Sequence, residues 1–128
     1  MILMPVVYVS DVDASVAFYA ALGFVERNRS RSGAWVELDG PGGRLGLHES
    51  RARRAPALPE ADEPVGPGVV MLGFVTTEPL EKLVEAVAQA GHEPVRGIAD
   101  ESFGRSVVLA DPDGAHIQVN EHDEELYT

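Results

Sequence analysis

Two stretches of this 128-residue chain carry the same succession of hydrophobic patterns. Each half opens with an apolar run, at Val6 to Val9 and again at Val69 to Val75. A stripe of apolar residues at helical spacing follows each run. The spacing predicts one amphipathic helix in each half, with an apolar face that a sheet must cover.

Both predicted helices carry terminal signals. Asp11 suits the N-cap of the first helix, because its carboxylate accepts a backbone N–H of the first turn. Pro79 suits the first turn of the second helix, where no backbone N–H is needed. Gly23 and Gly91 suit the C-terminal caps. The apolar stripes are Val12, Val16, Phe18, Tyr19 and Leu22 in the first helix and Leu80, Leu83, Val84 and Val87 in the second.

Each half then closes with a strand, a turn and a second strand. In the last strand of each half, aliphatic residues alternate with other residue types, so the two kinds point to opposite faces. The aliphatic set is Leu45, Leu47, Ile117 and Val119, and the other set is Gly46, His48, His116, Gln118 and Asn120. The closing segments superpose with a constant offset of 72, which places Val36 over Val108. The pattern therefore indicates an internal duplication.

The stretch 51–68 differs from both halves, because it holds four prolines and little periodicity. We interpret it as an exposed connector. The predicted organisation is a first module at 1–50, a linker at 51–68, a second module at 69–122 and an acidic tail at 123–128. Helices on one sheet face and a mixed polar and apolar surface on the other predict an α+β fold that forms a binding cup.

Composition narrows the function. The chain has no cysteine, which excludes disulfide frameworks, zinc knuckles and thiol catalysis. Its net charge of −11 disfavours nucleic acid and anionic membranes as partners; the charge either keeps the protein soluble or attracts cationic ligands. The N-terminus lacks a basic start, its apolar run is broken by Pro5, and no stretch is long enough for a membrane helix. We expect a soluble, cytoplasmic protein.

Two motifs carry a family resemblance. The first runs from Val7 through Ser10-Asp11, Ser15 and Phe18-Tyr19 to Leu22-Gly23-Phe24. The second joins Phe103-Gly104-Arg105 to Asp111-Pro112-Asp113-Gly114, whose turn we interpret as structural. Together they resemble the vicinal oxygen chelate superfamily of glyoxalases, bleomycin resistance proteins and extradiol dioxygenases. The resemblance implies two tandem βαβββ modules, with a cup-shaped mixed sheet and the helices on its outer face.

Catalytic members of that superfamily hold a divalent metal on the cup face. Matched position by position, their ligands fall on Met4, on Leu72 (or Val70 if the strand is shifted), on Gly46 and on Gln118. None of these is a histidine or a carboxylate, the ligands that such metals prefer. We therefore expect a metal-free member with no cofactor, although a displaced site built from Glu37, His48 and His116 stays open.

The resemblance and the strand alternation together give a candidate binding surface. The expected lining residues are Tyr8, Trp35, Glu37, His48, Phe74, Phe103, Arg105, His116, Gln118 and Asn120. Such a surface suits a flat or amphipathic small molecule. Metal-free relatives sequester cationic or aromatic antibiotics, so we expect a binding protein of this type, acting as a homodimer on a small-molecule ligand.

An enzymatic alternative remains. His48, His116 and Glu37 could act as general acid–base residues in a lyase or isomerase without metal, because imidazole suits proton transfer near neutral pH. Turnover separates this hypothesis from stoichiometric binding.

Overall fold

The computed structural model describes residues 1–52 and 66–127. The chain divides into two compact units, Met1–Arg54 and Ala55–Thr128. Most of the predicted linker, residues 53–65, lies outside the described part, and the predicted domain bounds stay predictions. In the described part, the two α-helices have 10 residues each, and neither is long and apolar enough to cross a membrane.

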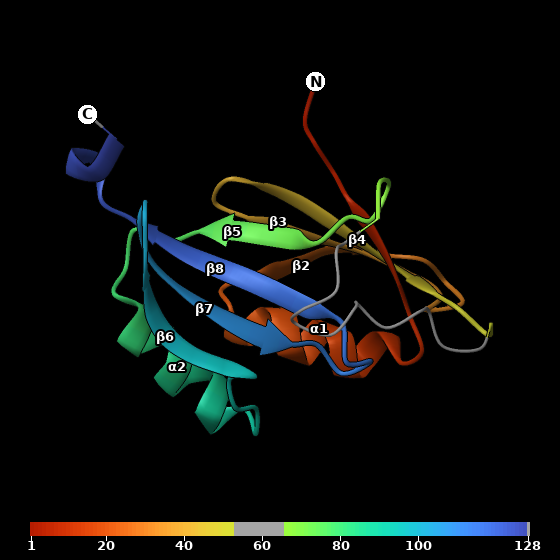
Figure 1. Ribbon diagram of the computed structural model, residues 1–128. Helices are drawn as coiled ribbons and strands as arrows, with labels where there is room; N and C mark the ends of the chain where they lie inside the picture. The colour runs from red at the N-terminus through yellow and green to blue at the C-terminus, as the bar shows by residue number, and fades with distance from the viewer. Residues whose placement is uncertain (53–65, 128) are drawn as a thin grey trace. The chain divides into compact units, whose positions relative to one another are not determined.

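The first unit holds one strand, one helix and three further strands. They are β1 (Val6–Val9), α1 (Val12–Ala21), β2 (Val25–Arg29), β3 (Trp35–Gly40) and β4 (Gly43–Glu49). The strand order is β1-β4-β3-β2, with β1 parallel to β4 and the other pairs antiparallel. Helix α1 contacts β2, β3 and β4, so it covers one face of this mixed sheet (Figure 1).

The second unit repeats the arrangement. It holds β5 (Leu72–Val75), α2 (Leu80–Gln89), β6 (Arg96–Glu101), β7 (Gly104–Ala110), β8 (His116–His122) and a short 3-10 helix, η1 (Glu124–Tyr127). The strand order is β5-β8-β7-β6, again with the first pair parallel. Helix α2 contacts β7 and β8. The expected α+β fold of two repeated βαβββ modules is confirmed.

The helix ends follow the sequence signals except at Pro79, which is the N-cap residue of α2 and not part of its first turn. The carboxylate of Asp11 accepts the backbone N–H of Ala14 at 3.0 Å, which caps α1. Both helices end in a glycine with positive φ, Gly23 at 99° and Gly91 at 89°. Beyond Gly23, the N–H of Phe24 donates to the carbonyl of Tyr19, the bond of a Schellman cap. The same bond recurs after Gly91, so the caps repeat as the sequence predicts.

The core of each unit lies between the helix and one face of its sheet, which we call the helix face. In the first unit, buried side chains of the sheet meet buried residues of α1; they are Val9, Val36, Leu38, Leu45 and Leu47 from strands and Val12, Phe18 and Tyr19 from the helix. In the second unit, they are Leu80, Val87, Val107, Leu109, Ile117 and Val119. Each unit therefore has its own apolar core.

One part of the predicted superposition is wrong. Leu47 pairs with Val36 across β3 and β4, whereas Val119 pairs with Val107 across β7 and β8. The equivalent of Val36 is therefore Val107, one residue before the predicted Val108. The turn between the last two strands is longer in the second unit, and Val107 is fully buried whereas Val108 is only half-buried.

The register of the first strand in the second unit is also settled. Val7 of β1 pairs with Leu47, and Phe74 of β5 pairs with Val119, so Val7 and Phe74 are equivalent. Counting back along both strands, the counterpart of Met4 is Met71. The predicted counterparts Leu72 and Val70 are wrong, because their parity is that of Phe74, which points to the helix face.

Candidate functional site

Three aromatic side chains form a row across the first sheet, on the face opposite the helix. Tyr8 pairs with His48 across β1 and β4, and His48 pairs with Trp35 across β4 and β3. The ring centroids are 5.3 Å apart for Tyr8 and His48, and 6.1 Å apart for Trp35 and His48. Tyr8 is 67% exposed, so this aromatic row is open to solvent.

The middle of this surface is made by a glycine. A Cβ added to Gly46 would collide with the Cη2 atom of Trp35 and lie only 3.0 Å from Cζ3. The indole therefore lies directly over the backbone of β4. A side chain at position 46 would push the indole away, so Gly46 permits the placement of Trp35.

A backbone contact orients His48. Its Nδ1 lies 2.7 Å from the carbonyl oxygen of Glu49. A carbonyl only accepts, so Nδ1 donates and carries a proton. In the neutral ring, Nε2 is then the hydrogen-bond acceptor. The aromatic row thus holds one polar atom that can accept a hydrogen bond from a ligand.

Next to the aromatic row lies a set of paired charges. The carboxylate of Glu37 accepts from the side-chain amide of Asn28 at 2.8 Å. Asp39 contacts Arg27 at 2.9 Å and Arg44 at 3.2 Å. The hydrogen bond from Arg27 is the main cause that lowers the pKa of Asp39 below its ordinary value. Glu37 shares the face of Trp35, as the sequence suggests, but it is already engaged.

The opposite face of the second sheet is mixed, with Val75 and Val108 beside polar side chains of β8. Gln118 and Asn120 lie there on β8, and the Nε2 of Gln118 donates to the Oδ1 of Asn120 at 2.7 Å. Ser106, opposite Asn120 on β7, is fully buried. Its hydroxyl accepts from Arg96 at 2.6 Å and donates to Glu101 at 2.7 Å. His116 shares this face through its pairing with Ala110.

Two predicted lining residues lie on the helix face instead. Phe74 pairs with the buried Val119, so its side chain points toward the core side of the sheet. Arg105 belongs to β7 and not to a loop, which corrects the sequence interpretation. Phe103 does lie in the turn before β7, and its ring packs against His122 with centroids 5.3 Å apart.

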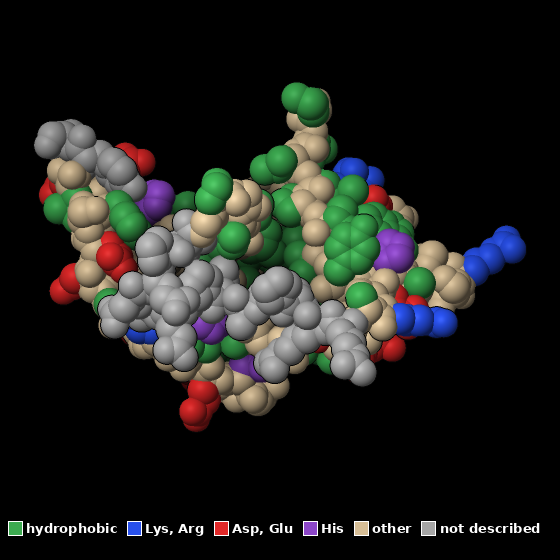
Figure 2. Space-filling model, turned by 45° about the vertical axis from the view of Figure 1, so that its right-hand side comes forward, with side chains coloured by type: hydrophobic (Ala, Val, Ile, Leu, Met, Phe, Trp, Pro, Cys, Tyr) green, Lys and Arg blue, Asp and Glu red, His purple; other side chains and the backbone are tan. Residues whose placement is uncertain are grey.

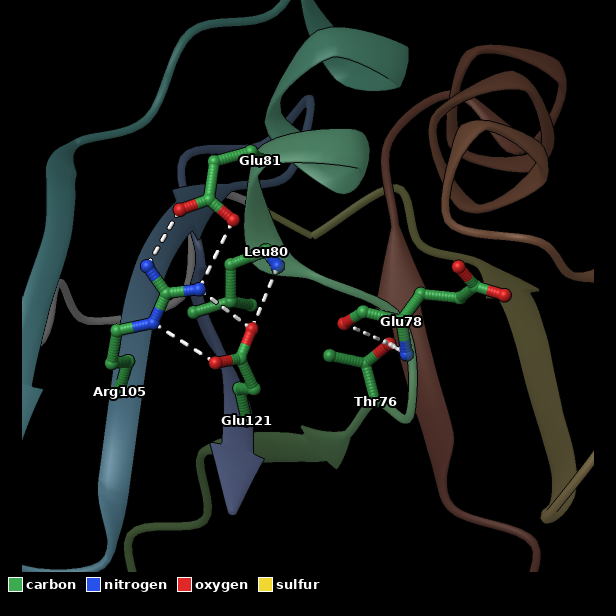
Figure 3. A network of polar contacts seen from close by, with 6 residues as sticks. All are labelled: Thr76, Glu78, Leu80, Glu81, Arg105 and Glu121. Atoms are coloured by element: carbon green, nitrogen blue, oxygen red, sulfur yellow. Dashed lines mark hydrogen bonds and ion pairs between the residues drawn. The ribbon is translucent and has the colours of Figure 1, made fainter. Parts of the chain in front are cut away.

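Arg105 is the centre of a charge network at the start of α2 (Figure 3). Its guanidinium binds both oxygens of Glu81, the closer at 2.6 Å, and both oxygens of Glu121, at 2.9 and 2.8 Å. Glu121 also accepts the backbone N–H of Leu80 at 3.0 Å, so a strand residue caps the helix. The hydrogen bond from Arg105 is the main cause that lowers the pKa of both glutamates.

This network holds α2 on β7 and β8, and it was missed from the sequence. Glu121 belongs to β8 and is partly buried. A hollow of about 390 Å³ adjoins the network. Its lining is Asp100, Glu101, Gly104, Arg105, Glu121, Asp123 and Leu126.

The Asp-Pro-Asp-Gly turn has the structural role expected of it. Asp111 is 5% exposed, and its carboxylate accepts the backbone N–H groups of Asp113 at 2.9 Å and Ala115 at 2.8 Å. Burial raises the pKa of Asp111, and these hydrogen bonds oppose that shift. The turn lies between β7 and β8 and closes their hairpin.

The family model described as Glyoxalase/Bleomycin resistance protein/Dioxygenase superfamily matches residues 2–119. The chain belongs to this superfamily. A comparison with curated protein sequences gave no match.

Solved structures of other proteins share the fold. The virulence protein STM3117 from Salmonella typhimurium is 27% identical, with a TM-score of 0.69 over 96% of this chain and 97% of that one. A glyoxalase/dioxygenase from Nostoc punctiforme has 20% identity and a TM-score of 0.76, covering 96% and 91% of the two chains. TioX from Micromonospora sp. ML1 has 16% identity and a TM-score of 0.74, covering 96% and 99%.

The residues at the superfamily's metal-ligand positions do not fit a divalent cation. With the corrected register, these positions are Met4, Met71, Gly46 and Gln118. Two thioethers, a glycine and an amide lack the imidazole and carboxylate groups that such cations prefer. The indole of Trp35 also lies over Gly46. In residues 1–52 and 66–127, no three histidine or acidic side chains are grouped to hold an ion.

Proposed function

We propose that this protein is a metal-independent small-molecule binding protein that holds a flat, cationic or aromatic compound, as an antibiotic-sequestering member of its superfamily would. The single observation that carries the proposal is the exposed aromatic row of Tyr8, His48 and Trp35. Planar ligands stack on such rings, and cations are attracted to their faces. The net charge of −11 favours cationic over anionic ligands.

The remaining predicted lining residues support the proposal to different degrees. Glu37 lies beside the aromatic row, and Gln118, Asn120 and His116 lie on the corresponding face of the second sheet. Phe74 and Arg105 support it least, because both lie on helix faces. Phe103 would contribute only from its turn.

Trp35 is the only tryptophan of the chain, so its fluorescence reports on this surface. We expect proflavine, a planar cation, to bind stoichiometrically and reversibly, with quenching of Trp35 emission and no product formed. Calorimetry gives an affinity independent of fluorescence.

Replacing His48 by Leu should weaken binding at least about fivefold, the loss of one contact of about 1 kcal/mol. His122→Leu removes an exposed histidine from the second unit and is the matched control. Equal binding of anthraquinone-2-sulfonate, a planar anion, would contradict the charge preference.

A second candidate function is acid–base catalysis by His48 in a lyase or isomerase. The protonated Nδ1 favours it, because Nε2 is then the basic nitrogen of the neutral ring. Turnover of a carbonyl compound that His48→Ala abolishes, with binding retained, would establish this function in place of sequestration.

We also propose a homodimer. Large apolar side chains are exposed on and before the edge strands β1 and β5: Ile2, Leu3, Val6, Val69, Val70, Met71 and Val75. Figure 2 displays exposed hydrophobic side chains along the segment that leads to the N-terminus. Exposed apolar surface of this kind supports self-association. Light scattering coupled to size-exclusion chromatography should give twice the 13.7 kDa chain mass, and a monomer at micromolar concentration would contradict it.

A further inference from the structure

We infer that Gln118 and Asn120, on the face of the second sheet opposite the helix, bind the edge of a planar amide. The group meant is one in which an N–H and a C=O lie side by side, as in a lactam, a cis peptide bond or a primary carboxamide. The inference deepens the proposed binding function, and rests on it, by naming a neutral group that the ligand carries.

The first argument is the hydrogen bond between the two side chains. The Nε2 of Gln118 donates to the Oδ1 of Asn120 at 2.7 Å, which fixes both amide planes. The atoms that this hydrogen bond leaves for a ligand are the Oε1 of Gln118, an acceptor, and the Nδ2 of Asn120, a donor. Side by side, an acceptor and a donor complement the N–H and C=O of an amide edge.

The second argument is access. Gly73 of β5 lies next to Gln118 in the sheet, and a Cβ at Gly73 would meet only the Gln118 carbonyl oxygen, at 4.0 Å. In the part of the chain that the structure describes, no side chain therefore lies within 4 Å of the point where a Cβ of Gly73 would be. Both amides are only partly buried, and the neighbouring Val75 is 62% exposed. A flat group can approach the sheet over Gly73 and contact both amides.

The third argument is charge. Ser106, beside Asn120, gives its only hydroxyl proton to Glu101 and accepts from Arg96, so it donates nothing to a ligand. Arg96 and Glu101 form an ion pair at 3.6 Å, so their charges balance. Neither a carboxylate nor an ammonium group gains a free countercharge here. A neutral polar group therefore suits this part of the sheet surface best.

The test uses 2-piperidone, a small lactam with no aromatic ring, and N-methyl-2-piperidone, which keeps the carbonyl but lacks the N–H. Each is titrated into ¹⁵N-labelled full-length protein, and the side-chain amide signals of Gln118 and Asn120 are followed. We expect saturable shifts with 2-piperidone and an affinity at least about fivefold lower for the N-methyl compound, the effect of one lost hydrogen bond. Equal affinities, or no shift of these signals, would overturn the inference.

Two variants sharpen the test. Gln118→Leu keeps the size of the side chain but removes the acceptor, and Gly73→Val closes the approach; each should weaken 2-piperidone binding at least about fivefold. Gly97→Val is the matched control, because a Cβ at Gly97 meets nothing within 4 Å. If Gly73→Val fails to fold, judged by its amide spectrum, Gln118→Leu decides the outcome. Unchanged binding by Gln118→Leu would refute the amide site.

The two proposals fail separately. 2-Piperidone cannot stack, so its binding is read at Gln118 and Asn120 and should leave Trp35 emission unchanged. Proflavine binding is read at Trp35. If proflavine does not bind but 2-piperidone does, the aromatic row is rejected and the amide site is kept. If proflavine binds but 2-piperidone does not, only the amide site is rejected.

Discussion

The indole of Trp35 lies over Gly46, its diagonal neighbour on the adjacent strand, so closely that position 46 has no room for a Cβ. In the superfamily this position corresponds to a metal ligand in catalytic members. Here the space above it is taken by an aromatic ring. This arrangement supports the proposal that the protein holds its ligand without a metal ion.

Gly46→Ala tests this relationship. The added methyl group must displace the indole, which is the far end of a side chain and moves without unfolding the sheet. We expect a shift of Trp35 emission and weaker proflavine binding, with a change in unfolding free energy below about 1 kcal/mol. Gly97→Ala, at a glycine where a Cβ would meet nothing within 4 Å, is the control. An unchanged emission spectrum in Gly46→Ala would contradict the proposed packing.

Glu121→Ala removes the carboxylate that caps α2 from the neighbouring sheet. The N–H of Leu80 loses its acceptor, and Arg105 loses one of its two partners. Helix caps of this kind contribute about 1 kcal/mol, so urea unfolding should detect a loss of that size. Glu93→Ala, at an exposed carboxylate outside the helices and strands, should leave stability unchanged. A loss of the same size in both variants would disprove the capping role.

The same network predicts a pH dependence. Arg105 holds the pKa values of Glu81 and Glu121 below their ordinary range in the folded state. Their contribution to stability is therefore complete above the unfolded-state pKa and is lost as the pH falls through the lowered folded-state values. The difference in urea midpoint between the natural chain and Arg105→Met should be full at neutral pH and shrink in acid. Lys82→Met, which breaks the exposed pair of Lys82 with Glu78, should give a small difference at every pH. A difference for Arg105→Met that does not change with pH would contradict the pairing.

Replacing Asp111 by Ala and by Asn should lower the stability of the protein by different amounts. Asp111→Ala leaves the backbone N–H groups of Asp113 and Ala115 without their acceptor, and the loss of these two hydrogen bonds should cost about 2 kcal/mol. Asp111→Asn keeps an acceptor oxygen and removes a charge that burial disfavours, as the raised pKa indicates, so it should cost less. Thermal unfolding shows which of the two variants is more stable. An Asn variant less stable than the Ala variant would show that the charge itself is needed.

Gly104 is required by the backbone at the start of β7. Its φ is 140°, and a Cβ there would collide with the carbonyl oxygen of Glu121. Gly104→Ala combines strain with a backbone clash, and we expect a loss of about 3 kcal/mol or more. Gly97→Ala on β6, where a Cβ meets nothing, is the control. Chemical denaturation measures the stability of both variants. Equal stabilities would show that Gly104 is not required.

The elements that depend on local signals could be predicted from the sequence. The Asp11 cap, the glycine caps at 23 and 91 and the alternation along β4 and β8 follow from the conformational preferences of a few neighbouring residues. The shared face of Trp35 and Glu37 followed from strand parity in the same way, because they lie two residues apart on one strand. These signals are contained in single segments and do not depend on pairing with distant ones.

The relationships between segments could not be predicted as well. The placement of Val36 over Val108 was off by one, because a longer turn at Asp111 shifts the register between β7 and β8 without altering the pattern of either strand. Arg105 and Glu121 lie 16 residues apart, and nothing in the spacing indicates that both meet the first turn of α2. A salt-bridge network of this kind becomes visible only with the strand pairing in hand.

In both modules, the residues that form the core and the candidate binding residues lie on opposite faces of the sheet. On the helix faces, both units pack aliphatic residues in matching positions, and changes there would unfold the domain. On the opposite faces, the first unit carries rings and the second carries amides, although the backbone beneath is the same. Substitutions on these faces leave the two cores intact, so selection could retune what each half recognises, independently of the other, without rebuilding the scaffold.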